Sequence, residues 1–162
     1  MNDKINNVKQ RTFQFQAVIF QIEGQWYGVH ILALEEILPL LEIKPVPNGP
    51  KFLEGVINLR GDVVPIINLR EILGCRRELI PFESRILITA VYSNRVGIIF
   101  DEVEDVQQFR PDQVHPAVID PGKTHFIEEI VKLDSGPMIQ MIGIGKLLND
   151  GSIHQWFTFE TG

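Results

Sequence analysis

Side chains that could do chemistry are few in this chain and do not form a catalytic pattern. Cys75 is the only cysteine, which excludes an intrachain disulfide and an all-cysteine metal site. The serines lack the strand–turn–helix setting of a nucleophile elbow. The four histidines are scattered and belong to no His-Glu-x-x-His motif: His30, His115, His125 and His154. The sequence therefore predicts a binding module without enzymatic activity, metal or cofactor.

Weaker motifs are better explained by structure than by chemistry. The acidic run between residues 101 and 105 lacks the glycine and the spacing of a calcium loop. The Gly-Ile-Gly at 143–145 lacks the third glycine and the lysine–serine or lysine–threonine pair of a phosphate-binding loop. His125 and Glu128 form an isolated His-x-x-Glu spacing, and such isolated pairs are usually ordinary surface residues. The Arg-Gly-Asp at 60–62 matches the adhesion tripeptide, but three residues are too few for a specific match.

One arginine stands out, in the apolar stretch "GVINLRGDVVPIINLREILG" at residues 55–74. A guanidinium keeps its proton and is costly to bury without a partner, so Arg60 needs a carboxylate, ideally in a bidentate pair. Glu35 and Glu36 are the candidates. Strand alternation places Arg60 at a strand end, beside a turn, so we expect a half-buried pair at the edge of a sheet. Such a pair forms a recognition site or closes the end of a barrel, and the two roles are compatible.

Composition limits the classes of partner. The chain has 162 residues, 44% of them hydrophobic and 22% charged, as in ordinary globular proteins. Its net charge of −6 and its lack of a basic run disfavour nucleic acid and anionic membranes as partners. No segment approaches the roughly 20 apolar residues of a membrane span. We expect a cytoplasmic protein without membrane insertion.

Period-2 alternation of apolar residues, with turn signals about every ten residues, is typical of an all-β sandwich or barrel. It predicts about nine or ten short strands, most of them in hairpins within 13–31, 52–68, 85–103 and 125–144. Short helical turns are expected after residue 31, at 69–73 behind an Asn68 cap, and at 145–150. Residues 104–122 are predicted to be turn-rich.

Four motifs in order resemble the CheW-type chemotaxis coupling proteins over residues 13–149. They are "FQIEGQWYGVHILALEEIL", "PVPNGPKFLEGVINLRGDVVPIINLREILG", "RVGIIFDEVEDV" and "MIQMIGIGKLL". The Pro50–Arg70 block and the Val-Gly-x-x-x-Asp-x-Val-x-Asp-Val block at 96–106 are the most specific.

The resemblance implies two small five-stranded β-barrels packed together, with short helical turns. It implies a CheW-like domain at 13–149 with a lobe boundary near 75–85, followed by a second tail at 150–162. The polar residues 1–12 predict a flexible tail before this domain. It also implies a non-catalytic adaptor between the cytoplasmic tips of methyl-accepting chemoreceptors and the regulatory domain of the histidine kinase CheA, at membrane-associated receptor arrays.

The resemblance further implies a partner-binding surface. It centres on the turn at Arg60 and Gly61, and Glu36 is the glutamate expected to pair with Arg60. Leu34 is expected to contact the receptor, and Gly97 and Val106 of the second barrel are expected to line a groove between the barrels. The residues are Leu34, Glu36, Gly55, Asn58, Arg60, Gly61, Gly97 and Val106. For Leu34 and Val106 a plain core role is the alternative; for Gly55 and Gly97 it is backbone geometry.

Other hypotheses remain open at the level of sequence. A CheW-like scaffold in a non-motility chemosensory pathway would use the same residues with different partners. An enzyme on a β-barrel scaffold is disfavoured by the lack of a catalytic pattern. A fragment of the kinase is disfavoured because the chain starts with methionine and a polar tail, and a fused coupling protein because no receiver domain follows.

Overall fold

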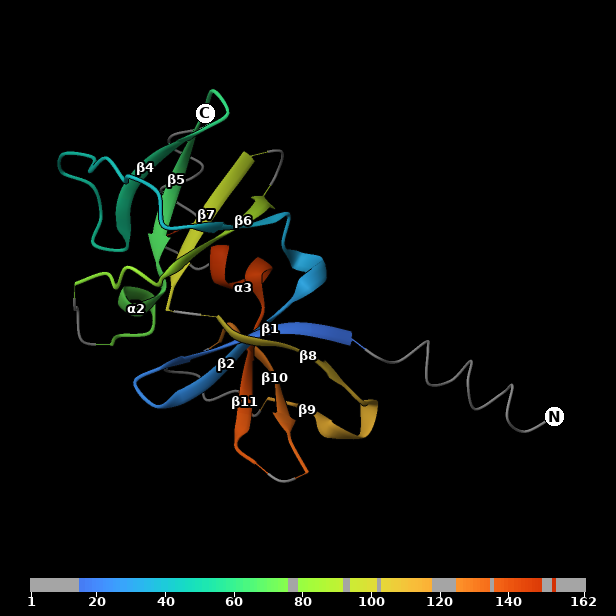
Figure 1. Ribbon diagram of the computed structural model, residues 1–162. Coiled ribbons are helices and arrows are strands. Elements are labelled where there is room, and N and C mark those ends of the chain that lie inside the picture. Colours follow the sequence, from blue (N-terminus) through green and yellow to red (C-terminus); the bar gives the residue numbers. More distant parts are fainter. Residues whose placement is uncertain are drawn as a thin grey trace. The chain divides into compact units, whose positions relative to one another are not determined.

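The structure is a computed structural model that describes residues 15–75, 79–91, 94–101, 103–117, 125–134, 136–149 and 153. Figure 1 shows its strands and short helices along the chain. In chain order they are β1 (Phe15–Ile22), β2 (Gln25–His30), the 3₁₀ helix η1 (Ile31–Ala33), β3 (Glu36–Pro39), β4 (Leu53–Leu59), β5 (Asp62–Asn68), α2 (Leu69–Ile72), β6 (Arg85–Val91), β7 (Asn94–Phe100), β8 (Val103–Phe109), the 3₁₀ helix η2 (Pro111–Gln113), β9 (Val114–Pro116), β10 (Ile127–Lys132), β11 (Met138–Ile142) and α3 (Ile144–Leu148).

The described strands form two sheets, and the predicted all-β class is confirmed. The first sheet has the order β8-β1-β2-β11-β10-β9, and the second has the order β3-β6-β7-β5-β4. β11 lies parallel to β2, and β5 lies parallel to β7. The first sheet has six strands where five were predicted, because the three-residue strand β9 also pairs with β10.

The chain divides into two compact units. Among the described residues, one unit comprises Phe20–Gln25 and Leu32–Glu104. The other comprises the described residues before Phe20, the segment Trp26–Ile31, and the described residues from Asp105 onward. This division differs from the predicted boundary near 75–85. The reason is that β6 pairs with β3 and with β7, and β7 pairs with β5, so the segment after residue 85 completes the same sheet as the segment before it.

The prediction that residues 104–122 are turn-rich is wrong for its first part. The segment Val103–Phe109 is strand β8, at the edge of the six-stranded sheet beside β1. Its glutamate and aspartate have low strand propensity, and pairing with a neighbouring strand outweighs that preference. The buried Phe109 packs with residues of β1, β10 and β11 in the apolar cluster of this unit: Ala17, Ile19, Val131, Ile139 and Met141.

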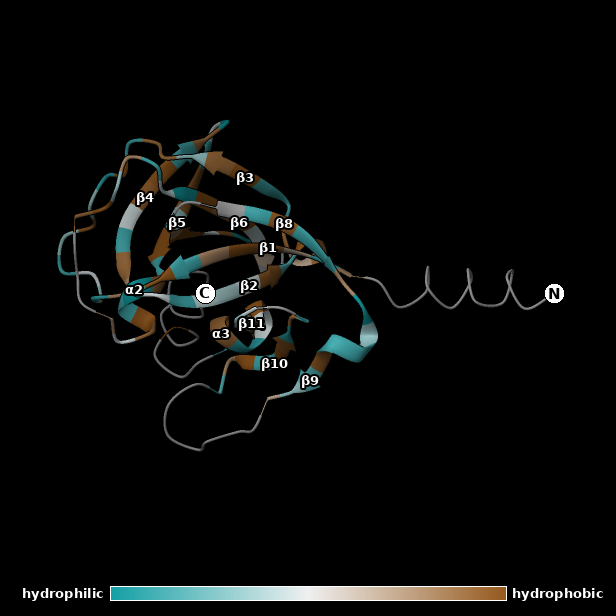
Figure 2. Ribbon diagram, turned by 60° about the horizontal axis from the view of Figure 1, so that its bottom comes forward, coloured by the Kyte–Doolittle hydropathy of each residue, from teal (hydrophilic) through white to brown (hydrophobic). Residues whose placement is uncertain are grey.

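The five-stranded sheet surrounds the other unit's core. Along β4, Leu53, Ile57 and Leu59 are buried while Asn58 is exposed, which is the alternation expected of a half-buried strand. Figure 2 shows the corresponding change between hydrophobic and hydrophilic segments along β4. The core cluster gathers seven buried side chains: Ile57, Leu59, Val64, Ile66, Ile86, Ile88 and Ile99.

The two edge strands of this sheet, β3 and β4, are joined by few backbone contacts. An isolated bridge pairs Lys44, beyond β3, with Val56 of β4 through hydrogen bonds of 2.9 Å in both directions. Gly55 makes this approach possible, since it has φ of 149° and a Cβ there would lie 2.2 Å from the Lys44 carbonyl oxygen. The segment Glu36–Pro39 pairs only with β6 in the described sheet.

The surroundings of Gly97 show how tightly the core of the five-stranded sheet is packed. A Cβ at this position would lie 2.4 Å from Ile66 Cδ1 and 2.9 Å from Ile86 Cγ2, and both neighbours are fully buried. We expect Gly97→Ala to lower the free energy of unfolding by about 1–3 kcal/mol, the usual cost of overpacking a core. Urea unfolding followed by circular dichroism measures the loss.

Gly145→Ala is the matched control. Gly145 lies in α3, and no atom lies within 4 Å of where its Cβ would be. The added methyl group should leave stability unchanged or raise it by about 0.5–1 kcal/mol, because alanine is the better helix former. Equal free energies of unfolding for Gly97→Ala and the wild type would show that this core accepts an added methyl group without strain.

Candidate functional site

The turn between β4 and β5 is a two-residue loop made of Arg60 and Gly61. Leu59 and Asp62 pair on either side of it, and the loop residues have φ of 50° and 91°. Two positive φ values are what a type I′ hairpin turn requires. Glycine adopts them freely, whereas arginine does so at a cost. Asn58 Oδ1 accepts a hydrogen bond of 3.0 Å from the Gly61 amide and so stabilises the turn.

The turn presents Arg60 to the first residue of β3, Glu36. The Arg60 Nη1 donates to Glu36 Oε1 at 3.1 Å, and Nη2 donates to Oε2 at 2.6 Å. Of the two candidate glutamates, Glu36 is therefore the partner, and the pair is bidentate. Because Arg60 lies in the turn that follows β4 and Glu36 lies in β3, the pair links the β4–β5 turn to the opposite edge strand of the sheet.

This pair is more exposed than the sequence suggested. The Arg60 side chain is 61% exposed and that of Glu36 is 32% exposed, so the expected half-buried pair is half-buried only on its glutamate side. The cause is the turn itself, which carries Arg60 beyond the last paired residues of β4 and β5. The charge of Arg60 therefore keeps access to water, and its place in an apolar stretch of sequence does not mean burial.

The two charges stabilise each other. The hydrogen bonds from Arg60 hold the pKa of the Glu36 carboxyl below its ordinary value of 4.5, against a smaller opposing effect of burial. The positive charges of Arg60 and Arg95 lower this pKa further. The same contact raises the pKa of Arg60. Both groups therefore carry their charge throughout the neutral range.

Exposed apolar side chains belong to the strands that carry this pair. Val63, in β5 next to the turn, is 71% exposed, and Ile37, next to Glu36 in β3, is 40% exposed. Apolar anchors beside a charge pair of fixed geometry are the usual components of a protein-binding surface. Sequence reasoning named neither residue: Val63 falls at an apolar position of a predicted strand, and Ile37 falls in the segment after residue 31 where a short helical turn was expected.

The structure brings together four of the predicted site residues and separates the others. Glu36, Asn58, Arg60 and Gly61 lie at one turn of the five-stranded sheet. Three others are in the same unit at different places: Leu34 is half-buried just before β3, Gly55 approaches Lys44, and Gly97 is packed against Ile66. The structure gives both glycines a backbone or packing role, and their contact with a partner stays a prediction.

Val106 belongs to the other unit. It lies in β8 and is partly exposed, and its amide donates to Asp105 Oδ1 at 2.8 Å. It is therefore not core in this chain, whereas contact with a partner stays a prediction.

A second arginine–carboxylate pair was missed by sequence reasoning. Arg70 follows the Asn68 cap of α2, whose Oδ1 accepts from the Arg70 amide at 2.9 Å. Its side chain, only 14% exposed, donates from Nε and Nη2 to Asp101 at 3.1 and 2.5 Å, and its Nη1 lies 3.9 Å from Glu23. The pair ties α2 to the end of β7. Arg70 and Asp101 lie 31 positions apart, and only the parallel pairing of β5 with β7 shows that they meet.

Nothing in the described part of the chain has the donor set of a metal centre. No group of three or more histidine, cysteine or carboxylate side chains gathers there in a way that could hold an ion. His30 lies 3.4 Å from Glu129 as an isolated pair. Burial raises the pKa of the Cys75 thiol, which disfavours the reactive thiolate. No helix among the described residues is long and apolar enough to cross a membrane.

Comparison with known proteins agrees with this fold. The CheW-like domain family matches residues 16–152. The chemotaxis protein CheW of Treponema pallidum (strain Nichols) is 29% identical over 88% of this chain and 86% of its own length. That of Bacillus subtilis (strain 168) is 32% identical over 73% and 77%. The crystal structure of the scaffolding protein TtCheW from Thermoanaerobacter tengcongensis superposes with a TM-score of 0.75 at 30% identity, over 83% of this chain and 92% of that chain.

These matches agree with the four sequence motifs and with the two β-sheets. The chain therefore belongs to the CheW-like family of chemotaxis scaffold proteins.

The charge pair makes a prediction about titration. Because the pKa of Glu36 is held below 4.5, this side chain should titrate below that pH in the wild type and close to it in Arg60→Ala. A carboxyl whose pKa is depressed on folding stabilises the fold above its unfolded pKa, and that contribution disappears as the pH falls through its folded pKa. NMR observation of the Glu36 side-chain carbonyl carbon between pH 2.5 and 7 gives the midpoints. Identical midpoints in the two proteins would show that the pair does not persist in solution.

Proposed function

We propose that this chain is a non-catalytic adaptor that couples the cytoplasmic tips of chemoreceptors to the regulatory domain of the histidine kinase CheA. It works by contact alone and lies in the cytoplasm, at membrane-associated receptor arrays. The proposal is supported by membership in the CheW-like family and by relatives named as chemotaxis and scaffolding proteins. The described residues also offer a contact surface and no group with the geometry of a metal centre.

The observation that carries the proposal is the pre-formed pair of Arg60 with Glu36, and the strands at this end of the sheet also expose Val63 and Ile37. We expect the receptor tip to present a helix, and recognition of a helix by a groove uses apolar anchors for contact area and a charged pair for register. The pair is fixed by two hydrogen bonds before the partner arrives, so little side-chain freedom remains to be lost on binding. When the partner covers the pair, the contact between the charges becomes stronger, because water no longer screens it.

Arg60→Ala is expected to weaken binding to a receptor cytoplasmic fragment by about tenfold to a hundredfold, because it leaves Glu36 unpaired beneath the partner. The melting temperature should change little, since the pair is exposed in the free protein. Titration of labelled receptor fragment, with melting curves for each protein, measures both quantities.

The double variant separates a coupled pair from two independent contacts. Arg60→Ala with Glu36→Ala should lose less affinity than the sum of the single losses, because the second change removes the charge that the first one stranded. Strict additivity would mean that the two residues bind separately. A large fall in melting temperature with unchanged affinity would make the pair a structural closure of the sheet and would remove the basis of the proposed site.

The non-catalytic part of the proposal has its own test. The purified chain should hydrolyse neither ATP nor a phosphoprotein above the background of a mock preparation. Hydrolysis that disappears with a single substitution in this chain would overturn it.

A further inference from the structure

Arg95 connects the two elements that present the charge pair. It lies at the start of β7, and its Nε is 3.3 Å from Glu35 Oε2 while its Nη1 is 3.5 Å from Asp62 Oδ2. Glu35 immediately precedes Glu36 at the start of β3, and Asp62 immediately follows the Arg60–Gly61 turn. One guanidinium therefore reaches both carboxylates that adjoin the pair.

Sheet order explains why Arg95 can do this. β7 is the central strand of the order β3-β6-β7-β5-β4, with β5 next to it on one side and β3 two strands away on the other. Arg95 is thus anchored in the middle of the sheet, while Glu36 lies in the edge strand β3 and Arg60 lies in the turn after the other edge strand, β4. The backbone supports the β3 side as well, because the Glu35 amide donates to the Ile88 carbonyl at 2.8 Å.

The charges of Arg95 and Asp62 act on the pair of Arg60 and Glu36. Arg95 is among the causes that lower the pKa of Glu36, and Asp62 is among those that raise the pKa of Arg60. Glu35, Glu36 and Asp62 carry three negative charges against the two positive charges of Arg60 and Arg95. A network of this kind orders its side chains better than an isolated exposed pair does, since each added contact restrains groups that are already partly fixed.

The turn needs such restraint. Arg60 has a φ of 50°, which is unfavourable for a residue with a Cβ, so the orientation of the turn depends on contacts around it. Three contacts hold it: Asn58 to the Gly61 amide, Arg60 to Glu36, and Arg95 to Asp62. Of these, the contact of Arg95 fixes the turn to the centre of the sheet.

We propose that Arg95 is a positioning residue of the partner-binding surface, holding the Arg60–Gly61 turn and the start of β3 in the geometry that the partner recognises. This inference rests on the proposed function, because it concerns the same surface. Arg95 lies outside the two edge strands, and it would act on the surface through its contacts with Glu35 and Asp62.

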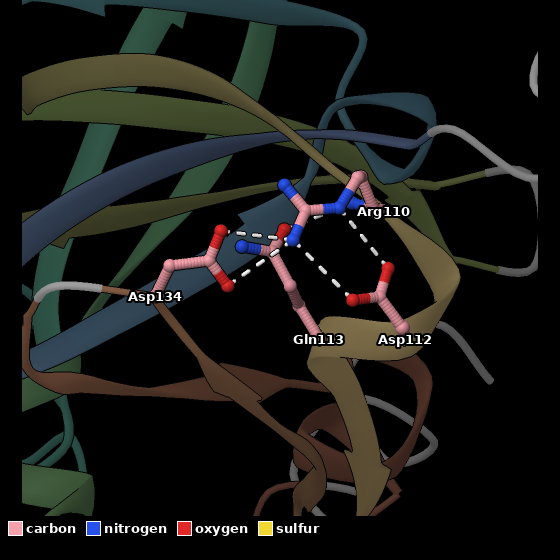
Figure 3. A network of polar contacts seen from close by, with 4 residues as sticks. All are labelled: Arg110, Asp112, Gln113 and Asp134. Carbon is pink, nitrogen blue, oxygen red and sulfur yellow. Dashed lines mark hydrogen bonds and ion pairs between the residues drawn. The ribbon is translucent and has the colours of Figure 1, made fainter.

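The chain offers a matched control in Arg110, which also bridges two carboxylates but belongs to the other unit. Arg110 donates to Asp112 at 3.1 and 3.3 Å and to Asp134 at 3.1 and 2.9 Å (Figure 3). Gln113 accepts from the Arg110 amide at 3.0 Å in the same network. Arg110→Ala therefore removes an arginine of the same kind without touching the turn.

The test uses the full chain with Arg95→Ala, Arg95→Lys, Arg60→Ala and Arg110→Ala. Two quantities are measured: the dissociation constant for a receptor cytoplasmic fragment, and backbone ¹⁵N relaxation at Gly61 and Asp62 in the free protein. We expect Arg95→Ala to weaken binding about three- to tenfold and to increase the mobility of both amides. The affinity and amide mobility of Arg95→Lys should lie between those of Arg95→Ala and the wild type. The reason is that a single ammonium group replaces the planar guanidinium that contacts two carboxylates. Arg110→Ala should match the wild type in both measurements.

The outcomes separate this inference from the proposed function. Unchanged affinity in Arg95→Ala, with Arg60→Ala weakened, overturns the role of Arg95 and leaves the proposed function standing. Weaker binding without any change in turn mobility also overturns it, since Arg95 would then contact the partner directly. Failure of the wild type to bind the fragment contradicts the proposed function, and the relaxation data then still decide whether Arg95 holds the turn.

Discussion

The surface at the β4–β5 turn depends on one constraint, the joining of two edge strands by side chains. β3 and β4 are the ends of the five-stranded sheet, and near Lys44 a backbone bridge connects them. At the turn after β4, the bidentate contact of Arg60 with Glu36 connects this turn to the start of β3. An unpaired strand edge is a hazard for a protein, and charged side chains at the edge are a common way to protect it. The same charges give this end of the sheet a defined polar pattern.

The energetics of the pair explain why it fits recognition better than stability. An exposed ion pair contributes little to folding, because water already solvates both charges. The value of the pair rises only when a partner excludes that water, and the arginine fork then gives a fixed direction to the contact. Exposed Val63 and Ile37 supply apolar area in the same unit. By contrast, Arg70 with Asp101 is mostly covered by the fold and anchors α2, which is a structural role.

Much of this was readable in the sequence because it is local. Two apolar segments, 52–59 and 63–69, predicted the hairpin, Gly61 marked its turn, and Asn68 marked the start of α2. The pairing of Arg60 with a glutamate was predicted because its positive charge needs a carboxylate partner. What the sequence could not show is long-range. The exposure of Arg60 depends on how far the turn extends beyond the sheet, and the reach of Arg95 depends on β7 being the central strand. Strand β8 was missed because pairing, and not the composition of the segment, makes it a strand.

The central claim, that the partner binds at the Arg60–Glu36 end of the five-stranded sheet, is tested most directly by mapping the contact in the unmodified protein. Amide chemical shifts of the ¹⁵N-labelled chain are followed while unlabelled receptor cytoplasmic fragment is added. The proposed site predicts that the largest changes fall on Asn58, Gly61, Val63 and residues 35–37. Large changes confined to the neighbourhood of Arg110 and Asp134, with the turn unaffected, would contradict it.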